Sequence, residues 1–344
     1  SGADALAYFS ALAQTQTGDM HRFGDAIAYS ERVPLGVCAG IGAWNYPVQI
    51  ACWKAAPALA AGNAFILKPS EMTPLSGNRL AELFAEAGLP SGLFQVVQGD
   101  YNIGRAICEH PGIAKVSLTG GVETGKLIMA QSAQTLKKIT LELGGKSPLI
   151  VFADADFDSA VQIALDANFY TAGEVCSNAT RVFVEDSIAA NFIAAIVERA
   201  EAMSVGDPME KNVDMGALIS AQHLEKVLEY VQIGIAEGAK LATGGHRVHP
   251  KGLENGYFME PTILTACRDD MRVVREEIFG PIMSVLTFAD EAEVIQRANA
   301  TSFGLGAGLM TQDLARGHRV AAQLESGNVG INSYNLLPPG LPFG

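Results

Sequence analysis

The sequence is short of basic residues. It carries 24 lysines and arginines against 37 aspartates and glutamates, so its formal net charge is −13. A nucleic-acid partner needs a basic face for its phosphates. We therefore exclude nucleic-acid binding. Because no block of like charges stands out, we interpret the acidity as a solvated surface.

Cysteine is also scarce and shows no pairing pattern. The five cysteines are odd in number, lie far apart in the sequence and form no C-x-x-C pair. This usage favours a reduced, cytoplasmic protein over a disulfide framework. The six histidines do not cluster with cysteines or carboxylates at the spacing of metal ligands, so we predict no zinc site and assign no residue as a metal ligand.

One long uncharged run has the length of a membrane span. The 19 residues from Leu35 to Trp53 carry no charge, but they include three glycines, an asparagine, a glutamine and a proline. The run has strand character first and helix character later, so we predict no membrane segment. The sequence shows no signal peptide, does not begin with Met and stops after "LPFG". We expect both ends to be cut from a longer protein.

Short apolar runs alternate with helical patterns along the chain. The runs "VPLGVCAGIGA", "AFILK", "LFQVV", "AKVSL" and "KKITLEL" are typical of strands, and helices are predicted between them. After "LGGKSP" the alternation restarts with "LIVF", "RVFV", "MSVLTF", "GAGLM" and "GNVGIN". This predicts an α/β fold of two doubly wound, mostly parallel domains that meet near residues 142–148. The polar segment 16–34 predicts a projecting hairpin.

Three predicted strands end in segments suited to a ligand. "TGGVETG" offers bare backbone N–H groups to a pyrophosphate, or is a tight turn. In "KPSE", Lys68 and Glu71 hold a phosphate or ribose hydroxyls, or cap a helix. "WNYP" places Asn45 at a strand end, where asparagine is often structural. Ligands of open parallel sheets bind beyond the carboxyl ends of the strands, so the coincidence favours a cofactor site.

A fourth segment, "YTAGEVCSNATRVFVED", holds Cys176 between a turn of small residues and an apolar run. The lack of cysteine pairs and of ligand spacing argues against a disulfide and against a zinc ligand. A buried filler and a nucleophile both remain open on the residues alone.

Six motifs in register resemble the aldehyde dehydrogenase superfamily over essentially the whole chain. They are "AWNYP", "LKPSE", "LTGGVETG", "LELGGKSP", "GEVCSN" and "REEIFGP". The segment "ERVPLGVCAGIGAWNYPVQIACWKAAPALAAGNAFILKPSEMTP" is most similar to the branch that oxidises betaine aldehyde and 4-trimethylaminobutyraldehyde. The resemblance implies NAD-dependent oxidation of such a trimethylammonium aldehyde. Another aliphatic aldehyde, a cysteine-dependent esterase or acyltransferase and a non-catalytic relative are the alternatives.

The resemblance also implies roles for four catalytic residues. Cys176 would be the nucleophile, and the oxyanion would be held by the side-chain amide of Asn45 and the backbone N–H of Cys176. Glu142 would be the base that activates water for hydrolysis of the thioester. Lys54 would belong to a charge relay whose glutamate partner lies beyond Gly344.

The resemblance implies NAD as the cofactor. It also implies a potassium ion with a structural role. Lys68 and Glu71 would hold the adenosine ribose, where a carboxylate disfavours the 2′-phosphate of NADP. Glu277 would bind the nicotinamide ribose, with Phe279 against the ring. The other implied cofactor positions are Gly42, Ala43, Trp44, Ser70, Gly120, Gly121 and Gly144.

The resemblance divides the chain by function as well. Residues 1–15 and 35–142 would form the NAD-binding domain, 16–34 an oligomerisation hairpin, and 143–344 the catalytic domain. The full-length protein would be a cytoplasmic homodimer or homotetramer.

Four aromatic residues match positions of a trimethylammonium pocket: Tyr46, Trp53, Tyr170 and Tyr334. Ring faces attract quaternary ammonium groups, which fits the expected substrate. Aromatic packing without a ligand is the alternative.

Two residues near Cys176 depart from the family pattern. Glu174 replaces the usual Gln and, if its carboxylate points at Cys176, disfavours the thiolate. Its side chain could equally point into solvent or bond a backbone amide. Ala179 replaces a Gly, which matters only if that position needs a positive φ.

Overall fold

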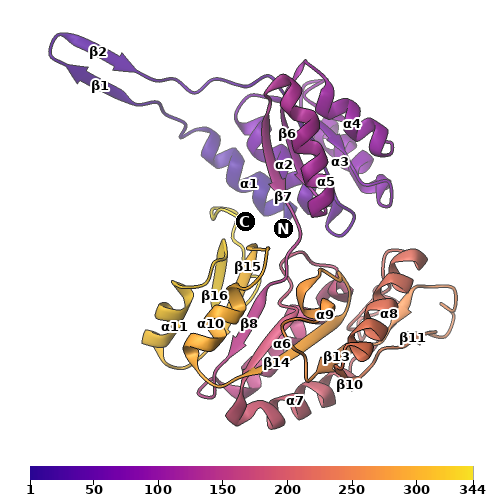
Figure 1. The fold of residues 1–344 in the computed structure, drawn as a ribbon. Helices are drawn as coiled ribbons and strands as arrows, with labels where there is room; N and C mark the ends of the chain where they lie inside the picture. The colour runs from indigo at the N-terminus through magenta and orange to yellow at the C-terminus, as the bar shows by residue number, and fades with distance from the viewer. Residues whose placement is uncertain (344) are drawn as a thin grey trace. The chain divides into compact units, whose positions relative to one another are not determined.

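The computed structural model describes residues 1–343, which divide into two compact units, Ser1–Leu143 and the chain from Gly144 onward. In Figure 1 the first unit runs from indigo to magenta and the second from magenta to yellow. Each unit has its own sheet, and all strand pairs of both sheets are parallel except the edge pair β10–β13. The predicted α/β class with mostly parallel sheets is confirmed.

The sheet of the first unit has the order β5-β4-β3-β6-β7, so the chain reverses direction of winding between β3 and β6. Helices cover both faces, because adjacent residues of β3 point to opposite sides: Cys38 packs with α2 and α3, and Ala39 packs with α4 and α5. The elements are β3 (Val37–Ile41), β4 (Ala64–Lys68), β5 (Phe94–Val96), β6 (Ile113–Thr119) and β7 (Lys138–Glu142), with α1 (Gly2–Ala13), α2 (Pro47–Ala60), α3 (Pro74–Glu86), α4 (Tyr101–Glu109), α5 (Val122–Ser132) and the short η1 (Ala133–Thr135).

The five strands predicted for this unit are all present. The residues at the two ends of helix α3 show why these ends could be predicted from the sequence. Thr73 occupies the N-cap position of α3, although its side chain makes no capping bond. Gly88 follows the helix with φ +85°, a conformation that glycine adopts without strain. Helices α1 and α4 were not identified from the sequence.

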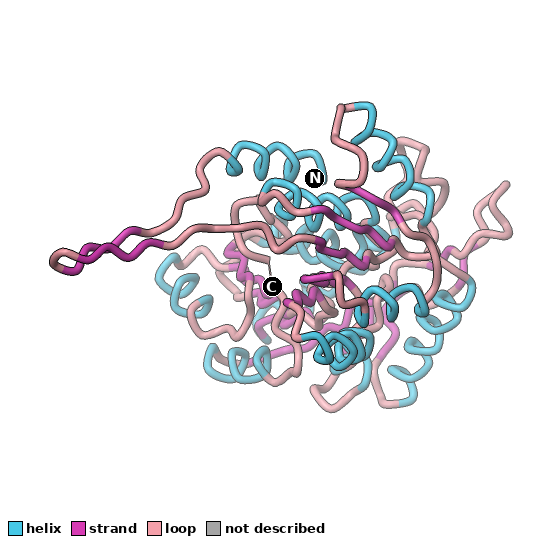
Figure 2. Tube along the Cα trace, turned by 90° about the horizontal axis from the view of Figure 1, so that it is seen from above, coloured by secondary structure: helices cyan, strands magenta, loops and turns pink. Residues whose placement is uncertain are grey.

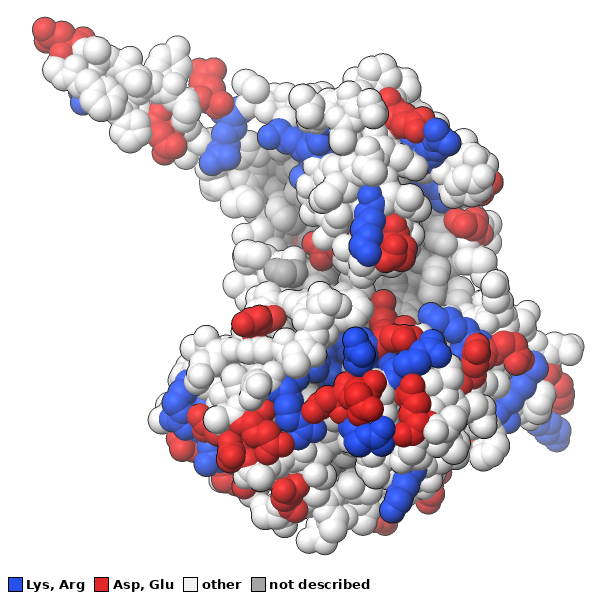
Figure 3. Space-filling view, in the orientation of Figure 1, with Lys and Arg blue, Asp and Glu red and all other residues white. Residues whose placement is uncertain are grey.

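A two-stranded ribbon, β1 (Met20–Phe23) with β2 (Ala26–Tyr29), lies within the segment predicted as a hairpin. Figures 1 and 2 show it at the end of two long loop segments, away from the sheet of its unit. Every residue of both strands is exposed, including large apolar side chains such as Phe23 and Ile27. In Figure 3 most of its surface is correspondingly uncharged.

The sheet of the second unit has the order β10-β13-β14-β9-β8-β15-β16. Its core includes the fully buried Ile150, Phe183 and Leu309 on three central strands. The elements are β8 (Pro148–Val151), β9 (Arg181–Glu185), β10 (Lys240–Thr243), β13 (Thr262–Thr265), β14 (Ile282–Phe288), β15 (Gly306–Met310) and β16 (Asn328–Ile331), with α6 (Phe157–Phe169), η2 (Tyr170–Gly173), α7 (Asp186–Glu201), α8 (Ala221–Ala236), α9 (Arg272–Arg275), α10 (Glu291–Asn299), α11 (Leu314–Ala321) and a ribbon of β11 (Arg247–Val248) and β12 (Phe258–Met259).

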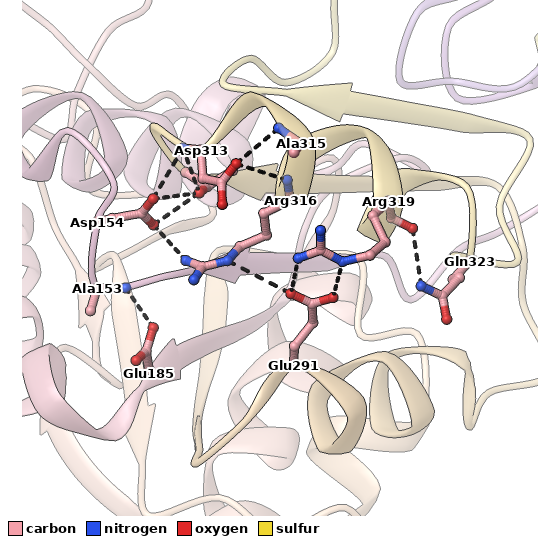
Figure 4. A network of polar contacts seen from close by, with 10 residues as sticks. Ala153, Asp154, Glu185, Glu291, Asp313, Ala315, Arg316, Arg319 and Gln323 are labelled. Atoms are coloured by element: carbon pink, nitrogen blue, oxygen red, sulfur yellow. Dashed lines mark hydrogen bonds and ion pairs between the residues drawn. The ribbon is translucent and has the colours of Figure 1, made fainter.

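Polar side chains of this unit fill the carboxyl edge of the sheet at β8 and β15, where the strand order reverses. The carboxylate of Asp154 accepts hydrogen bonds from Thr311 Oγ1 at 2.9 and 2.8 Å, from Asp313 N at 3.1 Å and from Arg316 Nη1 at 2.9 Å. Glu291 of α10 extends the network to Arg319 (Figure 4). Acidic and basic groups interleave over this side of the unit in Figure 3. These groups satisfy one another, and they join the loops after β8 and β15.

Replacing Asp154 by Asn should lower the free energy of unfolding by about 1 kcal/mol. The amide keeps the shape but loses the charge that strengthens bonds to Thr311 and Arg316, and partial exposure moderates the loss. Urea unfolding measures it. The control is Asp158→Asn, which removes a more exposed partner of Arg199 and should change stability by less than about 0.5 kcal/mol. Equal effects of the two substitutions would contradict a role for Asp154 at the strand ends.

Candidate active site

The three polar strand ends predicted in the first unit follow neighbouring strands. Asn45 comes after β3, Lys68 ends β4, and Gly120 follows β6. These strands lie in the order β4-β3-β6 and run parallel, so their carboxyl ends share one edge. The edge includes the point at which the strand order reverses, which is where doubly wound sheets bind ligands.

Asn45 lies in the connection between β3 and α2. Gly42 continues the strand, because its N–H donates to the carbonyl oxygen of Lys68 at 2.9 Å. Tyr46 is the N-cap residue of α2, and Pro47 starts the helix at a position where a missing N–H costs nothing. The hydrogen bond of Gly42 therefore fixes the backbone where the connection leaves β3, and Pro47 fixes it where α2 begins. Ala43 and Trp44 complete it.

Lys68 and Glu71 form an ion pair at the end of β4. The Lys68 side chain is buried and its Nζ donates to Pro69 O at 3.0 Å and to Glu71 Oε2 at 3.3 Å. The Glu71 side chain is 61% exposed, and Ser70 Oγ accepts from Met72 N. The N-cap residue of the following helix is Thr73, whose side chain makes no capping bond. Ligand binding and helix capping both stay predictions for Lys68 and Glu71.

Two glycines link β6 to α5. The N–H of Gly120 donates to the carbonyl oxygen of Glu142 at 3.0 Å, and Gly121 is the N-cap residue of α5. A Cβ built on Gly121 would have no atom within 4 Å. Open space beside the first turn of a helix leaves its N–H groups accessible to an anion such as a pyrophosphate.

Lys54 and Glu142 influence each other's ionisation in this unit. Lys54 Nζ donates to Ser117 Oγ at 2.9 Å. Burial lowers the pKa of Lys54 to about 8, which the negative charge of Glu142 opposes and the positive charge of Lys115 reinforces. Burial raises the pKa of Glu142, and the Lys54 ammonium opposes that shift. The charge of Glu142 thus acts on Lys54. The glutamate of the charge relay, expected beyond Gly344, stays a prediction.

In the second unit the predicted residues lie at the opposite edge of the sheet from the Asp154 network. Gly144 precedes β8, Cys176 precedes β9, and Glu277 precedes β14. These three strands are parallel neighbours in the order β14-β9-β8, so the segments before them meet at the amino edge. The rule that ligands bind at carboxyl ends points to the candidate residues of the first unit, but not to Gly144, Cys176 and Glu277.

Glu277 is held against the segment that precedes β8. Its Oε1 accepts from Gly145 N at 3.0 Å, and a Cβ on Gly144 would overlap its carboxylate. A side chain at position 144 would therefore displace the Glu277 carboxylate from its present position. Burial raises the pKa of Glu277, although the Gly145 bond and the charge of Lys146 act in the other direction.

Cys176 follows a segment with unusual backbone conformation. Thr171, Ala172 and Gly173 have φ of 48°, 54° and 71°. For a residue with a Cβ the left-handed region costs roughly 1–2 kcal/mol. Such strain persists only where the surroundings hold it, and a Cβ on Gly173 would overlap Gly280. The segment before the cysteine is therefore packed tightly against the segment that follows Phe279.

Cys176 differs from the other cysteines in its exposure. All five are free thiols, and four are buried, whereas Cys176 is partly exposed. Ser177, the residue after the cysteine, is held by two side chains near the end of the chain. Tyr334 Oη donates to the carbonyl oxygen of Ser177, and Ser177 Oγ donates to Asn335 Oδ1 at 2.7 Å. Cys176 is therefore not a fully buried residue, and its role as the nucleophile stays a prediction.

Glu174 bonds a backbone amide, one of the three alternatives for its side chain. Its Oε1 accepts from Ile219 N at 3.0 Å, and the residue is 8% exposed, so the solvent alternative is wrong. Burial raises the pKa of Glu174 to about 8, against the effect of the Ile219 bond. A carboxyl with this pKa is mostly uncharged at neutral pH and repels a nearby thiolate little.

Ala179 causes no strain. Its φ is not positive, and its N–H donates to the carbonyl oxygen of Ala167 at 3.1 Å. The departure from glycine is harmless at this position.

The four aromatic residues of the predicted pocket are divided between the units. Tyr46 and Trp53 lie at the start and in the middle of α2, and Tyr170 and Tyr334 lie in the second unit. Tyr170 is 61% exposed. The Tyr334 hydroxyl is bound to the residue next to Cys176, and burial raises its pKa.

Two residues near this edge were not identified from the sequence. Lys146 is 1% exposed, and its Nζ has no hydrogen-bond partner among the described residues. Burial lowers its pKa to about 7, opposed by the charge of Glu277. A lysine just before an apolar strand, as in "GGKSPLIV", is an available signal. The second residue, His223, gave no such signal.

Comparison with known proteins identifies the family. The model of the aldehyde dehydrogenase family matches residues 1–344. The chain belongs to the aldehyde dehydrogenase family. It is 55% identical over 344 residues to betaine aldehyde dehydrogenase of Brucella anthropi, and covers 71% of that protein. Betaine aldehyde dehydrogenase of Vibrio vulnificus is equally similar, at 55% over 345 residues.

Solved aldehyde dehydrogenases share the fold. The chain superimposes on betaine aldehyde dehydrogenase of Staphylococcus aureus, solved in complex with NAD+, with a TM-score of 0.97 and 40% identity, covering 99% of this chain and 68% of that one. An aldehyde dehydrogenase from Bacillus cereus gives a TM-score of 0.97 and 43% identity over 100% of this chain and 70% of that one. The predicted family membership and enzyme class are confirmed.

Residues 1–343 of this aldehyde dehydrogenase show neither a membrane-spanning helix nor a cluster of metal ligands. None of its helices there is both long and apolar enough to cross a membrane. In the same residues no three His, Cys, Asp or Glu side chains are grouped as metal ligands would be.

Proposed function

We propose that the protein oxidises betaine aldehyde, or a closely related trimethylammonium aldehyde, with NAD. Relatives named betaine aldehyde dehydrogenase at 55% identity over the whole chain support the substrate. The observation that carries the chemistry is the position of Cys176. It is the one partly exposed cysteine of the five, at an edge of the sheet that also holds the Glu277 segment.

In the proposed reaction Cys176 is the nucleophile. Its thiolate adds to the aldehyde carbon, so a C–S bond forms and the carbonyl electrons move to oxygen. The Asn45 side-chain amide and the Cys176 N–H donate to this oxyanion, which stabilises the thiohemiacetal. NAD, when bound, supplies the acceptor for the hydride that leaves the thiohemiacetal carbon. A thioester on Cys176 remains.

Glu142 is the proposed base for hydrolysis of this thioester. It takes a proton from water, whose oxygen adds to the thioester carbon, and the Cys176 thiolate leaves as the carboxylic acid forms. A carboxylate with a raised pKa is a stronger base than an ordinary one, and burial raises the pKa of Glu142. The Lys54 ammonium nearby, with its pKa of about 8, is a proposed member of a proton relay.

Each unit, taken separately, has residues that suit a part of a dinucleotide. In the first unit, Gly121 leaves the start of α5 open to a pyrophosphate, and the exposed Glu71 carboxylate suits ribose hydroxyls. In the second unit we assign Glu277 to the nicotinamide ribose and Phe279 to the ring. The buried lysine Lys68 orients Glu71 through their ion pair.

The trimethylammonium group is assigned to the rings of Tyr46, Trp53, Tyr170 and Tyr334. A quaternary ammonium cannot donate a hydrogen bond, so ring faces and exclusion of water are its main source of affinity. Each ring contact contributes roughly 0.5–2 kcal/mol. Two such contacts together contribute about 1–4 kcal/mol, a preference for betaine aldehyde over an uncharged aldehyde of equal length of about fivefold to several hundredfold.

The test is NADH absorbance at steady state with betaine aldehyde, 4-trimethylaminobutyraldehyde and propanal. We expect the two trimethylammonium aldehydes to give at least about tenfold higher kcat/KM than propanal. Propanal as the best substrate would overturn the substrate assignment and leave the oxidation itself standing. Ester hydrolysis without NADH from any aldehyde would favour the esterase alternative.

Replacing Glu71 by Gln should shift the cofactor preference toward NADP. The carboxylate repels a 2′-phosphate, and the amide does not, so the ratio of the NADP and NAD Michaelis constants should fall about tenfold or more. Initial rates with each cofactor measure this. Glu123→Gln, at an exposed glutamate of α5, is the control and should leave the ratio unchanged. An unchanged ratio in the Glu71 variant would mean that the adenosine ribose lies elsewhere.

For the organisation of the protein we propose a cofactor domain of residues 1–15 and 35–142 and a catalytic domain of residues 143–344. The ribbon within 16–34 is proposed as an oligomerisation element of a homodimer or homotetramer, because it exposes Met20, Phe23 and Tyr29. A cytoplasmic location accords with the relatives. A structural potassium ion stays a prediction.

A further inference from the structure

Helix α8 contacts the segment proposed to hold the nicotinamide. His223, in its first turn, has Nε2 2.7 Å from the carbonyl oxygen of Phe279. One helical turn later, Val227 fills the space next to Gly280, where a Cβ would lie 2.7 Å from its methyl groups. Residues four apart share one face of a helix, so α8 presents this face to the Phe279–Gly280 turn.

Phe279 has a backbone that needs support. Its φ is 64°, a left-handed conformation that a bulky residue rarely adopts. Such a conformation persists where neighbouring contacts determine it, and these occur most often at sites that bind ligands. The bond from His223 fixes the carbonyl of this very residue, and the two rings meet edge to face with centroids 6.3 Å apart.

The direction of the His223 bond is unambiguous. A carbonyl oxygen has no proton, so Nε2 carries the proton and donates it. Burial lowers the pKa of His223, although the bond to Phe279 opposes the shift, so the neutral Nε2–H tautomer is favoured near neutral pH. The side chain therefore acts as a fixed donor.

Glu174 connects the same histidine to the segment that carries Cys176. Its Oε1 lies 3.6 Å from His223 Nε2 and accepts from Ile219 N, in the connection that leads into α8. The two side chains are only 10% and 13% exposed. The contact of Gly173 with Gly280 joins the same two segments through their backbones.

We propose that His223 is a positioning residue for the oxidation. By donating to the carbonyl of Phe279, and by packing against Glu174, it holds the Phe279 turn in the conformation that receives the nicotinamide, at a fixed place relative to the Cys176 segment. The inference rests on the proposed function, because the assignment of Phe279 to the nicotinamide belongs to it. The chemistry at sulfur does not involve His223.

Two polar variants test the proposal. In His223→Gln the amide nitrogen takes the place of Nε2 and keeps the donor, whereas the shorter side chain of His223→Asn does not reach Phe279 O. We expect the Asn variant to raise the dissociation constant of NAD about tenfold, the equivalent of one buried hydrogen bond. The Gln variant should stay within about twofold of the parent protein. Titration of intrinsic fluorescence with NAD measures both.

The control is Gln222→Asn, which shortens the exposed neighbour of His223 by the same methylene group and should not change NAD binding. Hydrolysis of p-nitrophenyl acetate by Cys176 needs no nicotinamide and should stay unchanged in all three variants. Equal NAD affinity of the Gln and Asn variants would overturn the inference. So would a loss of ester hydrolysis parallel to the loss of NAD binding, because it would indicate a general structural defect.

The parent protein separates this inference from the proposed function. A parent that forms no NADH from any aldehyde overturns both. A parent that oxidises betaine aldehyde while His223→Asn binds NAD normally overturns only the role of His223.

Discussion

Cys176→Ala should abolish oxidation of the aldehyde and hydrolysis of esters together. Both reactions begin with the same thiolate, and an alanine leaves no nucleophile at this edge of the sheet. We expect kcat/KM to fall by at least about 10⁴-fold, while the affinity for NAD stays within about twofold. NADH absorbance, p-nitrophenol release and NAD titration measure the three quantities.

A matched control exists in the first unit. Cys108 is fully buried, and burial raises the pKa of its thiol, so Cys108→Ala should keep both activities. Incubation with iodoacetamide followed by mass spectrometry should label Cys176 before any other cysteine, because the remaining four are buried. NADH formation by Cys176→Ala would contradict the covalent mechanism.

Glu142→Gln should separate acylation from hydrolysis of the thioester. A glutamine cannot accept the proton of water, so the enzyme should release about one NADH per active site in a burst and then turn over about 10²-fold or more slowly. Stopped-flow absorbance at 340 nm resolves both phases. A slow first turnover without a burst would show that Glu142 acts before the thioester forms.

The pH profile adds a second readout for Glu142. Burial raises the pKa of this carboxyl, and only its ionised form is a base, so the steady-state rate of the parent should fall as the pH drops through that raised pKa. The Gln variant should lose this limb. Glu123→Gln, at an exposed position paired with Lys126, should keep both the limb and the parent rate.

Much of the first unit was predictable because its signals are local. The ends of β3, β4 and β6 carry Asn45, Lys68 and Gly120 directly in the sequence, and the carboxyl-edge rule then brings them together. The alternation of apolar runs with helical patterns was enough to predict the fold class. The amphipathic α1 and α4 were not identified. α4 is nine residues long, and the interpretation named no helix between its two flanking strands.

The second unit was harder, because its candidate residues precede their strands. Cys176 and Glu277 lie before β9 and β14, so a search at carboxyl ends would have led to Asp154 and its ion pairs. Only the resemblance to a known family pointed to the amino edge. The sequence does not show that the carboxyl edge of this sheet is occupied by ion pairs and hydrogen bonds among its own side chains.

His223 illustrates a kind of residue that single-sequence analysis misses. Its partner is the backbone carbonyl of a residue 56 positions away, and a backbone acceptor leaves no trace in residue type. Glu174 was noticed as a departure, but its bond to Ile219 N is equally invisible in the sequence. Lys146 differs, since a charged residue just before the apolar strand β8 can be recognised without a structure.

The exposed ribbon of β1 and β2 has a consequence for how the protein folds. A two-stranded ribbon is at best marginally stable alone, and none of its residues is buried within the chain. Under the proposed self-association, the free energy that orders the ribbon comes from a second molecule, and formation of the ribbon is a second-order process. Dilution would accelerate amide hydrogen exchange in residues 20–29 and leave the rest of the first unit protected, so order in this part of the protein becomes a property of its concentration.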